Sequence, residues 1–189
     1  MKNVLIYGSS RSGKTTLAKK LVKEFGYTYI SMDKLVTAFE SFDRNLGINH
    51  SDRSVKVVDT FERFLYPYLK SMAHLSLQDM PIPILVEGAY INLEYFLSSK
   101  LAKYYTLVVL VQLDKSEELY KKLKRYDTIN DWTYNLSDSD LLDYCKNLQE
   151  ENNRIIKLCE AYNLQYFNTS KGRDEVFKNI INALVKEDL

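Results

Sequence analysis

NVLIYGSSRSGKTT, residues 3–16, joins a short apolar run to a loop of glycine and hydroxyl residues. The run Val4–Tyr7 is continuously apolar, which favours a buried strand. The loop follows the pattern G-x-x-x-x-G-K-[ST], and residues 16–25 after it have helical spacing. A strand that runs through such a loop into a helix is the context this pattern requires, so the stretch predicts the first unit of an α/β fold.

The chemistry of the loop indicates phosphate binding. Glycines permit tight turns and close approach of the backbone, and the free N–H groups at a helix start attract anions. Lys14 adds a charge for the β- and γ-phosphates, and the Thr15 hydroxyl is a ligand for Mg²⁺. The alternative is a flexible turn without a ligand. We predict a P-loop that binds ATP through Gly8, Ser9, Ser10, Arg11, Ser12, Gly13, Lys14, Thr15 and Thr16.

Four further segments have the composition of strands, namely residues 28–31, 82–87, 105–112 and 164–168. Several of them are continuously apolar rather than alternating, as in strands that helices cover on both faces. Segments with helical spacing separate them. This alternation predicts a doubly wound α/β fold.

Two stretches are too long for simple connections between strands. Residues 33–80 have helical patterning that Tyr66-Pro67 interrupts, and we expect a kink or break there. Residues 115–162 hold a helix, a polar turn and a second helix, with Ser137 and Asp140 at the start of the second. Neither stretch has the composition of a linker, so both are interpreted as insertions within one domain that comprises residues 1–189.

Composition narrows the classes of partner. Hydrophobic residues make up 46% of the chain and charged residues 27%, as in ordinary globular proteins. A net charge of +1 creates no global attraction to nucleic acid or anionic lipid, and the longest aliphatic run, 107–111, is too short to cross a membrane. We expect a cytoplasmic protein without a nucleic-acid or membrane partner, in which Cys145 and Cys159 are buried. The oligomeric state stays open.

Motif absences separate the classes of P-loop protein. None of the six glycines follows an Asp by three residues, which excludes the D-x-x-G element of GTPases. The chain also lacks N-K-x-D and L-S-G-G-Q motifs. Small phosphotransferases remain.

The sequence resembles the P-loop nucleoside/nucleotide kinase superfamily, which includes adenylate-kinase-like, uridine-kinase-like and shikimate-kinase-like enzymes. The resemblance rests on Gly8–Thr16, on Ile30–Leu35 after the second strand, on Glu87-Gly88 at a strand end, and on Phe167–Ser170 before the last helix. It implies a five-stranded parallel sheet, ATP as phosphoryl donor and a mobile lid.

Two acidic residues at predicted strand ends are candidates for the chemistry. Asp33 lies where a doubly wound fold presents its ligand crevice, and its carboxylate can orient or deprotonate an acceptor hydroxyl. The alternative for Asp33 is an N-cap of a helix that begins at Lys34. Glu87 ends a buried strand, and it can hold a water on Mg²⁺ or bind substrate.

The predicted lid spans residues 121–140. The resemblance implies that an arginine of the lid closes over the phosphates, and Arg125 is our candidate. The alternative is a solvated helix face formed by Lys121, Lys122, Lys124 and Arg125. Trp132, Tyr126 and Tyr134 either stack on a ligand ring or pack within the lid.

The acceptor side is predicted in residues 34–80. Arg44 and Arg53 are candidate acceptor-binding residues, with ordinary surface residues as the alternative. The Leu-Arg pair by which nucleotide kinases hold a phosphate is Leu35-Val36 here, so its arginine is missing at that position. Whether the acceptor carries a phosphate stays open.

These observations predict an ATP-dependent phosphotransferase that moves the γ-phosphoryl of Mg-ATP to a small-molecule acceptor, such as a nucleoside, a nucleotide or a similar metabolite. Lys14, Asp33 and Arg125 are its predicted catalytic residues, and Thr15 and Glu87 are predicted to hold the metal. The alternatives are an ATP-binding regulatory module without transfer, and a toxin-like or antibiotic-modifying phosphotransferase. Asp33 and Glu87 favour an enzyme.

Overall fold

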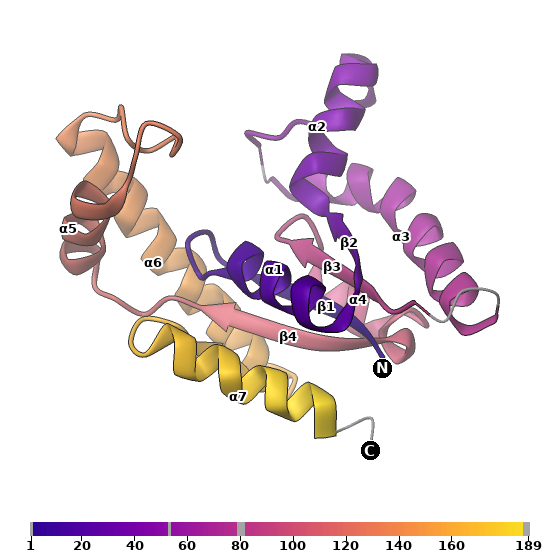
Figure 1. Cartoon of the computed structure of the whole chain (residues 1–189). Coiled ribbons are helices and arrows are strands. Elements are labelled where there is room, and N and C mark those ends of the chain that lie inside the picture. Colours follow the sequence, from indigo (N-terminus) through magenta and orange to yellow (C-terminus); the bar gives the residue numbers. More distant parts are fainter. Residues whose placement is uncertain (1, 53, 79–81, 187–189) are drawn as a thin grey trace.

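The structure, a computed structural model, describes residues 2–52, 54–78 and 82–186. A five-stranded, all-parallel sheet lies between helices (Figure 1). In chain order the elements are β1 (Asn3–Gly8), α1 (Lys14–Phe25), β2 (Thr28–Ser31), α2 (Met32–Phe42), η1 (Arg44–Leu46), α3 (Val55–Gln78), β3 (Ile84–Gly88), α4 (Leu93–Ser98), η2 (Ala102–Tyr104), β4 (Tyr105–Val111), α5 (Ser116–Tyr126), α6 (Asp138–Ala161), β5 (Tyr166–Asn168) and α7 (Arg173–Lys186).

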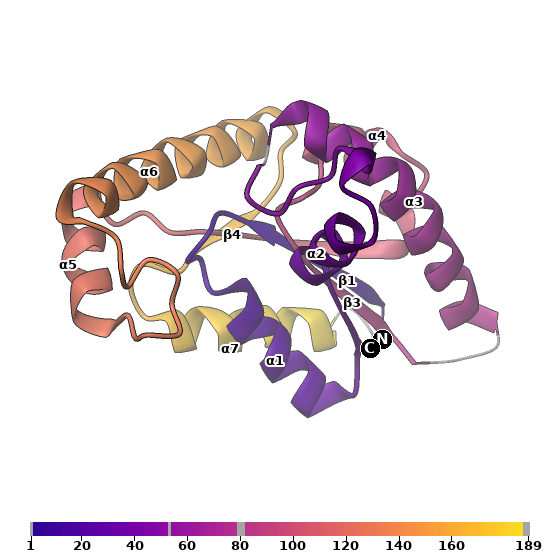
Figure 2. The same cartoon turned by 90° about the horizontal axis from the view of Figure 1, so that it is seen from above.

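Helices cover both faces of the sheet, as predicted. Figure 2 shows α1 and α7 on one side of the sheet and α3, α4 and α6 on the other. On the first side, Leu17 of α1 and Phe177 of α7 pack on Ile6 of β1. On the second side, the fully buried Phe61 of α3 and Ile155 of α6 belong to the larger apolar core. The β1 strand is buried along its whole length, which explains its continuously apolar sequence.

The order of the strands places a crevice beside β1. The order is β2-β3-β1-β4-β5, so β1 is central and pairs with β3 and β4. The chain leaves β1 toward α1 on one face and leaves β3 toward α4 on the other. Ligands of doubly wound folds bind where neighbouring strands diverge in this way, at their carboxyl ends.

Two details of the predicted elements differ from the structure. Of the kink or break predicted at Tyr66-Pro67, the break is absent, because α3 continues through Pro67. Pro67 is exposed, and the apolar face of α3 packs on both sides of it through Leu65 and Leu69, so packing offsets the lost backbone hydrogen bond. The third and fifth strands are shorter than predicted and begin at Ile84 and Tyr166.

The second insertion follows its prediction closely. Ser137 caps α6, and its Oγ accepts a hydrogen bond from the Asp140 N–H. Leu123 of α5 packs with Leu141 and Cys145 of α6 in a small cluster of its own. Burial raises the pKa of the Cys145 thiol to about 11, as expected for a cysteine that serves in packing. Within the described chain, no helix has both the length and the apolar composition needed to span a bilayer.

Glu62 is a buried carboxyl group on α3, and it predicts a pH-dependent stability. Its Oε1 accepts hydrogen bonds from the Asn92 N–H, at 2.5 Å, and from the Tyr66 hydroxyl, at 3.4 Å. Burial nevertheless raises its pKa from an ordinary 4.5 to about 7. The folded protein therefore holds this proton more tightly than the unfolded chain does. The stabilising contribution is complete below the unfolded pKa and is lost as pH rises through the folded pKa.

We expect the free energy of unfolding to decrease between about pH 5 and about pH 8 through this group, and Glu62→Gln to remove that part of the dependence. Urea unfolding of both proteins across this range measures the difference. The same pH slope in Glu62→Gln as in the unaltered protein would contradict the assignment.

Candidate active site

The loop between β1 and α1 depends on two glycines. Gly8 has φ 152°, and a Cβ there would lie 2.0 Å from the Leu110 carbonyl oxygen. Gly13 has φ 90° at the N-cap of α1, and a Cβ there would lie 2.9 Å from Phe177 Cζ. Side chains at these positions would clash with neighbouring elements or strain the backbone. The glycines therefore let the loop turn tightly onto the N-terminus of α1, as the pattern predicts.

Hydrogen bonds hold the P-loop from inside and outside. The Ser9 carbonyl accepts from Ser12 Oγ at 2.8 Å and from Lys14 Nζ at 2.7 Å. Ser9 Oγ donates to the buried Asn152 Oδ1 of α6 at 2.7 Å, and Thr169 Oγ1, after β5, donates to the Ser12 carbonyl at 2.9 Å. Two distant segments of the chain, α6 and the residues after β5, thus help to fix the shape of the loop.

Thr15 and Glu87 meet at the carboxyl ends of β1 and β3. Thr15 Oγ1 donates a hydrogen bond to Glu87 Oε1 at 3.3 Å. Glu87 Oε1 also accepts a hydrogen bond from the Tyr29 hydroxyl at 2.7 Å. Glu87 is only 2% exposed. Burial, followed by the hydrogen bond and the charge of Glu87, raises the pKa of Tyr29, so its hydroxyl stays a donor. A threonine hydroxyl beside a carboxylate is a donor set that suits Mg²⁺.

A cavity of about 830 Å³ lies between α2 and α6, and we call it the α2–α6 cavity. Ser10 of the P-loop, Asp33 of α2, Trp132 and Glu151 are among the residues that line it. The predicted alternative for Asp33 is wrong, because the N-cap of α2 is Ser31. Asp33 instead lies in the first turn of α2, beside the cavity.

A second cavity of about 320 Å³ lies between α5 and α7, and we call it the α5–α7 cavity. Arg11 of the P-loop, Lys122, Tyr126, Ser170 and Arg173 are among its lining residues. Ser10 borders the first cavity and Arg11 borders the second. Consecutive residues of the P-loop therefore face two separate cavities.

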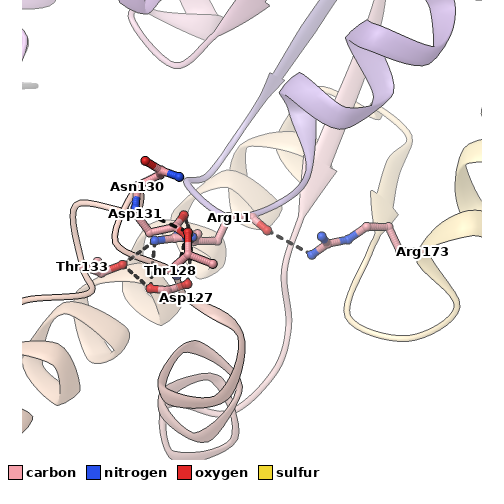
Figure 3. Close-up of polar contacts among 7 residues, drawn as sticks. All are labelled: Arg11, Asp127, Thr128, Asn130, Asp131, Thr133 and Arg173. Carbon is pink, nitrogen blue, oxygen red and sulfur yellow. Dashed lines mark hydrogen bonds and ion pairs between the residues drawn. The ribbon is translucent and has the colours of Figure 1, made fainter.

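Arg11 ties the P-loop to the lid loop, which comprises residues 127–137 (Figure 3). Its guanidinium donates to both Asp127 oxygens at 3.1 Å, to Asp131 Oδ1 at 3.0 Å, and to Thr133 Oγ1. Hydrogen bonds from Thr128, and then from Arg11, lower the pKa of Asp131. Charge-assisted bonds of this kind are stronger than neutral ones, so the network holds the lid loop against the P-loop.

Two of the arginines predicted for the lid and the acceptor side, Arg125 and Arg44, line neither cavity. The Arg125 guanidinium lies over the ring of Tyr126 with 5.2 Å to its centroid, and Arg125 is exposed at the end of α5. Arg44 is exposed in η1. Neither residue lines a cavity that borders the P-loop. Arg53 lies outside the described residues.

Of the three aromatic residues predicted to stack on a ligand or to pack within the lid, two border a cavity and one does not. Trp132 borders the α2–α6 cavity and packs edge-on against Tyr144 of α6, with 4.8 Å between ring centroids. Tyr126 borders the α5–α7 cavity. Tyr134 is half exposed and borders neither cavity. Trp132 and Tyr126 are thus the two lid aromatics placed to contact a ligand.

The strand order and the loop after β1 define the fold of the P-loop kinases, which confirms the predicted fold class. Two solved structures share it. A gluconokinase from Sinorhizobium meliloti 1021 is 16% identical, with a TM-score of 0.52 over 98% of this chain and 92% of that one. A shikimate kinase from Bacteroides thetaiotaomicron is 17% identical, with a TM-score of 0.56 over 97% of this chain and 98% of that one. The sequence matches no protein-family model, and no curated protein is significantly similar to it.

Proposed function

We propose that this protein is a small-molecule kinase that transfers the γ-phosphoryl of Mg-ATP to an acceptor hydroxyl or phosphate. The observation that carries the proposal is the position of the P-loop between two cavities, with Ser10 facing one and Arg11 the other. A protein that only binds ATP needs one cavity. Transfer between two substrates needs two that meet at the phosphates. The kinase fold of the structural neighbours supports the same conclusion.

The donor side is the N-terminus of α1 with its P-loop. Loop N–H groups and the Lys14 ammonium, which rests on the Ser9 carbonyl, would hold the β- and γ-phosphates. Thr15 and Glu87 would hold Mg²⁺, which neutralises phosphate charge during transfer when it is bound. The α5–α7 cavity would take the base of ATP beside Tyr126 and Arg173.

The acceptor side is the α2–α6 cavity. Among the described residues, no side chain bonds the Asp33 carboxylate, so it is available to accept a proton or a hydrogen bond from an acceptor hydroxyl. Arg44 and Arg53 stay candidate acceptor-binding residues. Phosphoryl transfer rests mostly on positioning and electrostatics. A cavity that borders the P-loop at Ser10 would position the acceptor beside the γ-phosphate.

The direct test is product identification. The purified protein is incubated with Mg²⁺ and γ-labelled ATP, together with one acceptor at a time from a panel of nucleosides, nucleotides, sugars and aminoglycoside antibiotics. Label on one acceptor supports the proposal and names its class, including the antibiotic-modifying alternative. ATP binding without transfer to any acceptor would favour the regulatory module.

Glu87→Gln is expected to lower Mg²⁺-dependent turnover by roughly 10- to 100-fold and to affect nucleotide binding less. The substitution keeps the shape of the side chain and removes its charge beside Thr15. Turnover against Mg²⁺ concentration, with nucleotide affinity measured in parallel, checks this. Tyr29→Phe is the matched control, because it removes the other hydrogen bond to Glu87 and leaves the charge. Equal losses of binding and turnover would indicate a structural carboxylate.

The lid is expected to change its conformation when both substrates bind. We propose that binding of both substrates breaks the bonds of Arg11 to Asp127 and Asp131 and brings Arg125 toward the γ-phosphate. Arg125→Ala is then expected to lower turnover by at least roughly tenfold, about 1.4 kcal/mol of transition-state stabilisation. Trp132, the only tryptophan, should change its fluorescence more with ATP analogue plus acceptor than with analogue alone. Normal turnover in Arg125→Ala and a silent Trp132 would leave the basic cluster as a solvated helix face.

A further inference from the structure

The buried face of α6 contains one residue that packing alone does not explain. Its buried residues recur every three or four positions, as on the inner face of an amphipathic helix. Asn152, 2% exposed, is the only polar residue among them, and the others are Leu141, Cys145, Leu148, Ile155 and Cys159. A buried amide costs free energy unless its hydrogen bonds are satisfied, whereas an apolar residue at this position would continue the face. The role of Asn152 therefore lies in its partners.

The Asn152 side chain joins three segments of the chain. Its Oδ1 accepts hydrogen bonds from the Ser9 hydroxyl at 2.7 Å and from the Gln112 N–H at 2.9 Å. Its Nδ2 donates to the Leu148 carbonyl at 2.7 Å, one turn earlier on α6. Ser9 belongs to the P-loop and is fully buried, and Gln112 directly follows β4. One side chain thus connects the P-loop, the end of β4 and α6.

Ser9 carries this connection to the phosphate-binding part of the P-loop. Its hydroxyl is bound to Asn152, while its carbonyl accepts hydrogen bonds from Lys14 Nζ at 2.7 Å and from Ser12 Oγ at 2.8 Å. A residue that is fixed through both its side chain and its carbonyl keeps little backbone freedom. The next residue, Ser10, borders the α2–α6 cavity. The position of α6 therefore influences the part of the P-loop that bears on Lys14.

We propose that Asn152 is a positioning residue for nucleotide binding. Through the Ser9 hydroxyl it holds the P-loop in the shape that receives the phosphates of ATP, so that the nucleotide does not have to order the loop as it binds. Preorganisation of this kind raises affinity because it reduces the cost of binding. The inference rests on the proposed binding of ATP by the P-loop and does not depend on phosphoryl transfer.

The first test measures nucleotide affinity. A non-hydrolysable ATP analogue is titrated with Mg²⁺ into the protein in a calorimeter. Asn152→Ala is expected to bind it at least roughly tenfold more weakly, since fixing the backbone of one residue costs about as much free energy as a tenfold change in affinity. Asn153→Ala is the matched control, because Asn153 is the exposed neighbour on α6, and it should keep the unaltered affinity. Unchanged affinity in folded Asn152→Ala would overturn the inference.

A second control separates positioning from general loss of stability. Cys159 lies on the same buried face of α6 and packs in the larger apolar core. Cys159→Ala should lower the melting temperature through lost packing and leave nucleotide affinity unchanged. Thermal melts of all variants accompany the titrations. If Cys159→Ala loses as much affinity as Asn152→Ala does, destabilisation of α6 is the cause and the inference is wrong.

Ser9→Ala tests the connection from the other side. It removes the hydroxyl and leaves the bonds of Asn152 to Gln112 and Leu148, so it also decides the matter if Asn152→Ala does not fold. We expect at least roughly threefold weaker binding in Ser9→Ala. Both substitutions remove the same bond, so the double variant should bind no more than about twofold more weakly than Asn152→Ala. Additive losses, or unchanged affinity in Ser9→Ala, would contradict the inference.

The two proposals fail separately. Nucleotide binding without phosphoryl transfer in the unaltered protein would remove the kinase function and leave the role of Asn152. Transfer to an acceptor, together with unchanged nucleotide affinity in folded Asn152→Ala and Ser9→Ala, would keep the kinase function and overturn that role.

Discussion

Lys14→Ala is expected to lower ATP-dependent phosphoryl transfer by roughly a hundred- to a thousandfold, as the loss of one preorganised charge at a reacting phosphate does. Lys14 is the first residue of α1, and its ammonium lies on the Ser9 carbonyl of the P-loop at 2.7 Å. The fold should persist, because alanine favours a helix and the loss of the hydrogen bond to the Ser9 carbonyl costs about 1 kcal/mol. Steady-state turnover and a thermal melt check both parts.

Lys19→Ala is the matched control for this substitution. Lys19 lies on the same helix and is exposed, and the P-loop does not bond its side chain. It should keep full turnover and the same melting temperature. Undiminished turnover in a folded Lys14→Ala protein would contradict the kinase proposal at its centre.

Local patterns predicted the P-loop and the fold class, because the relevant forces act within short segments. The glycines of the P-loop are required by the turn of the backbone itself, because Gly8 and Gly13 have φ values of 152° and 90°. The strands β1 and β3 are buried along their whole length and β4 along most of it, so a run of apolar residues marks each of these three. Strand ends were less accurate at Ile84 and Tyr166, since pairing with neighbours decides where a strand begins.

The contacts between the P-loop and distant segments were not predictable. Ser9 meets Asn152 across 143 residues of sequence, and Arg11 meets Asp127 and Asp131 across 116 and 120. For the contact between Ser9 and Asn152, the only local sign in the sequence is an asparagine at a buried position of an amphipathic helix. The contacts of Arg11 with the two aspartates have no local sign, because acidic residues in a polar loop usually face water. Sequence reasoning therefore chose Arg125 as the arginine of the lid and passed over the Arg11 side chain.

The structure also changes the reasoning for Asp33. With Ser31 as the N-cap of α2, Asp33 has no capping role to explain it. Its charge in the first turn favours the helix dipole by about 0.5 kcal/mol, which is too little to matter for folding. Its place beside the α2–α6 cavity is the remaining explanation.

Asp33→Asn is expected to lower turnover with the true acceptor by roughly a hundredfold or more, the range for loss of a general base, and to leave ATP affinity unchanged. Asparagine keeps the size of the side chain and loses the ability to take a proton. Turnover at saturating ATP across acceptor concentrations, with ATP affinity measured separately, shows which substrate is affected.

Glu94→Gln is the control for Asp33→Asn, because Glu94 is likewise an exposed acid in the first turn of a helix, α4, and lies outside the α2–α6 cavity. Removing a first-turn charge there should alter neither turnover nor ATP affinity. If Asp33→Asn lowers ATP affinity and turnover together, Asp33 acts on the donor side of the P-loop. If it changes neither, the acceptor is oriented without a base on α2, and the catalytic assignment of Asp33 is wrong.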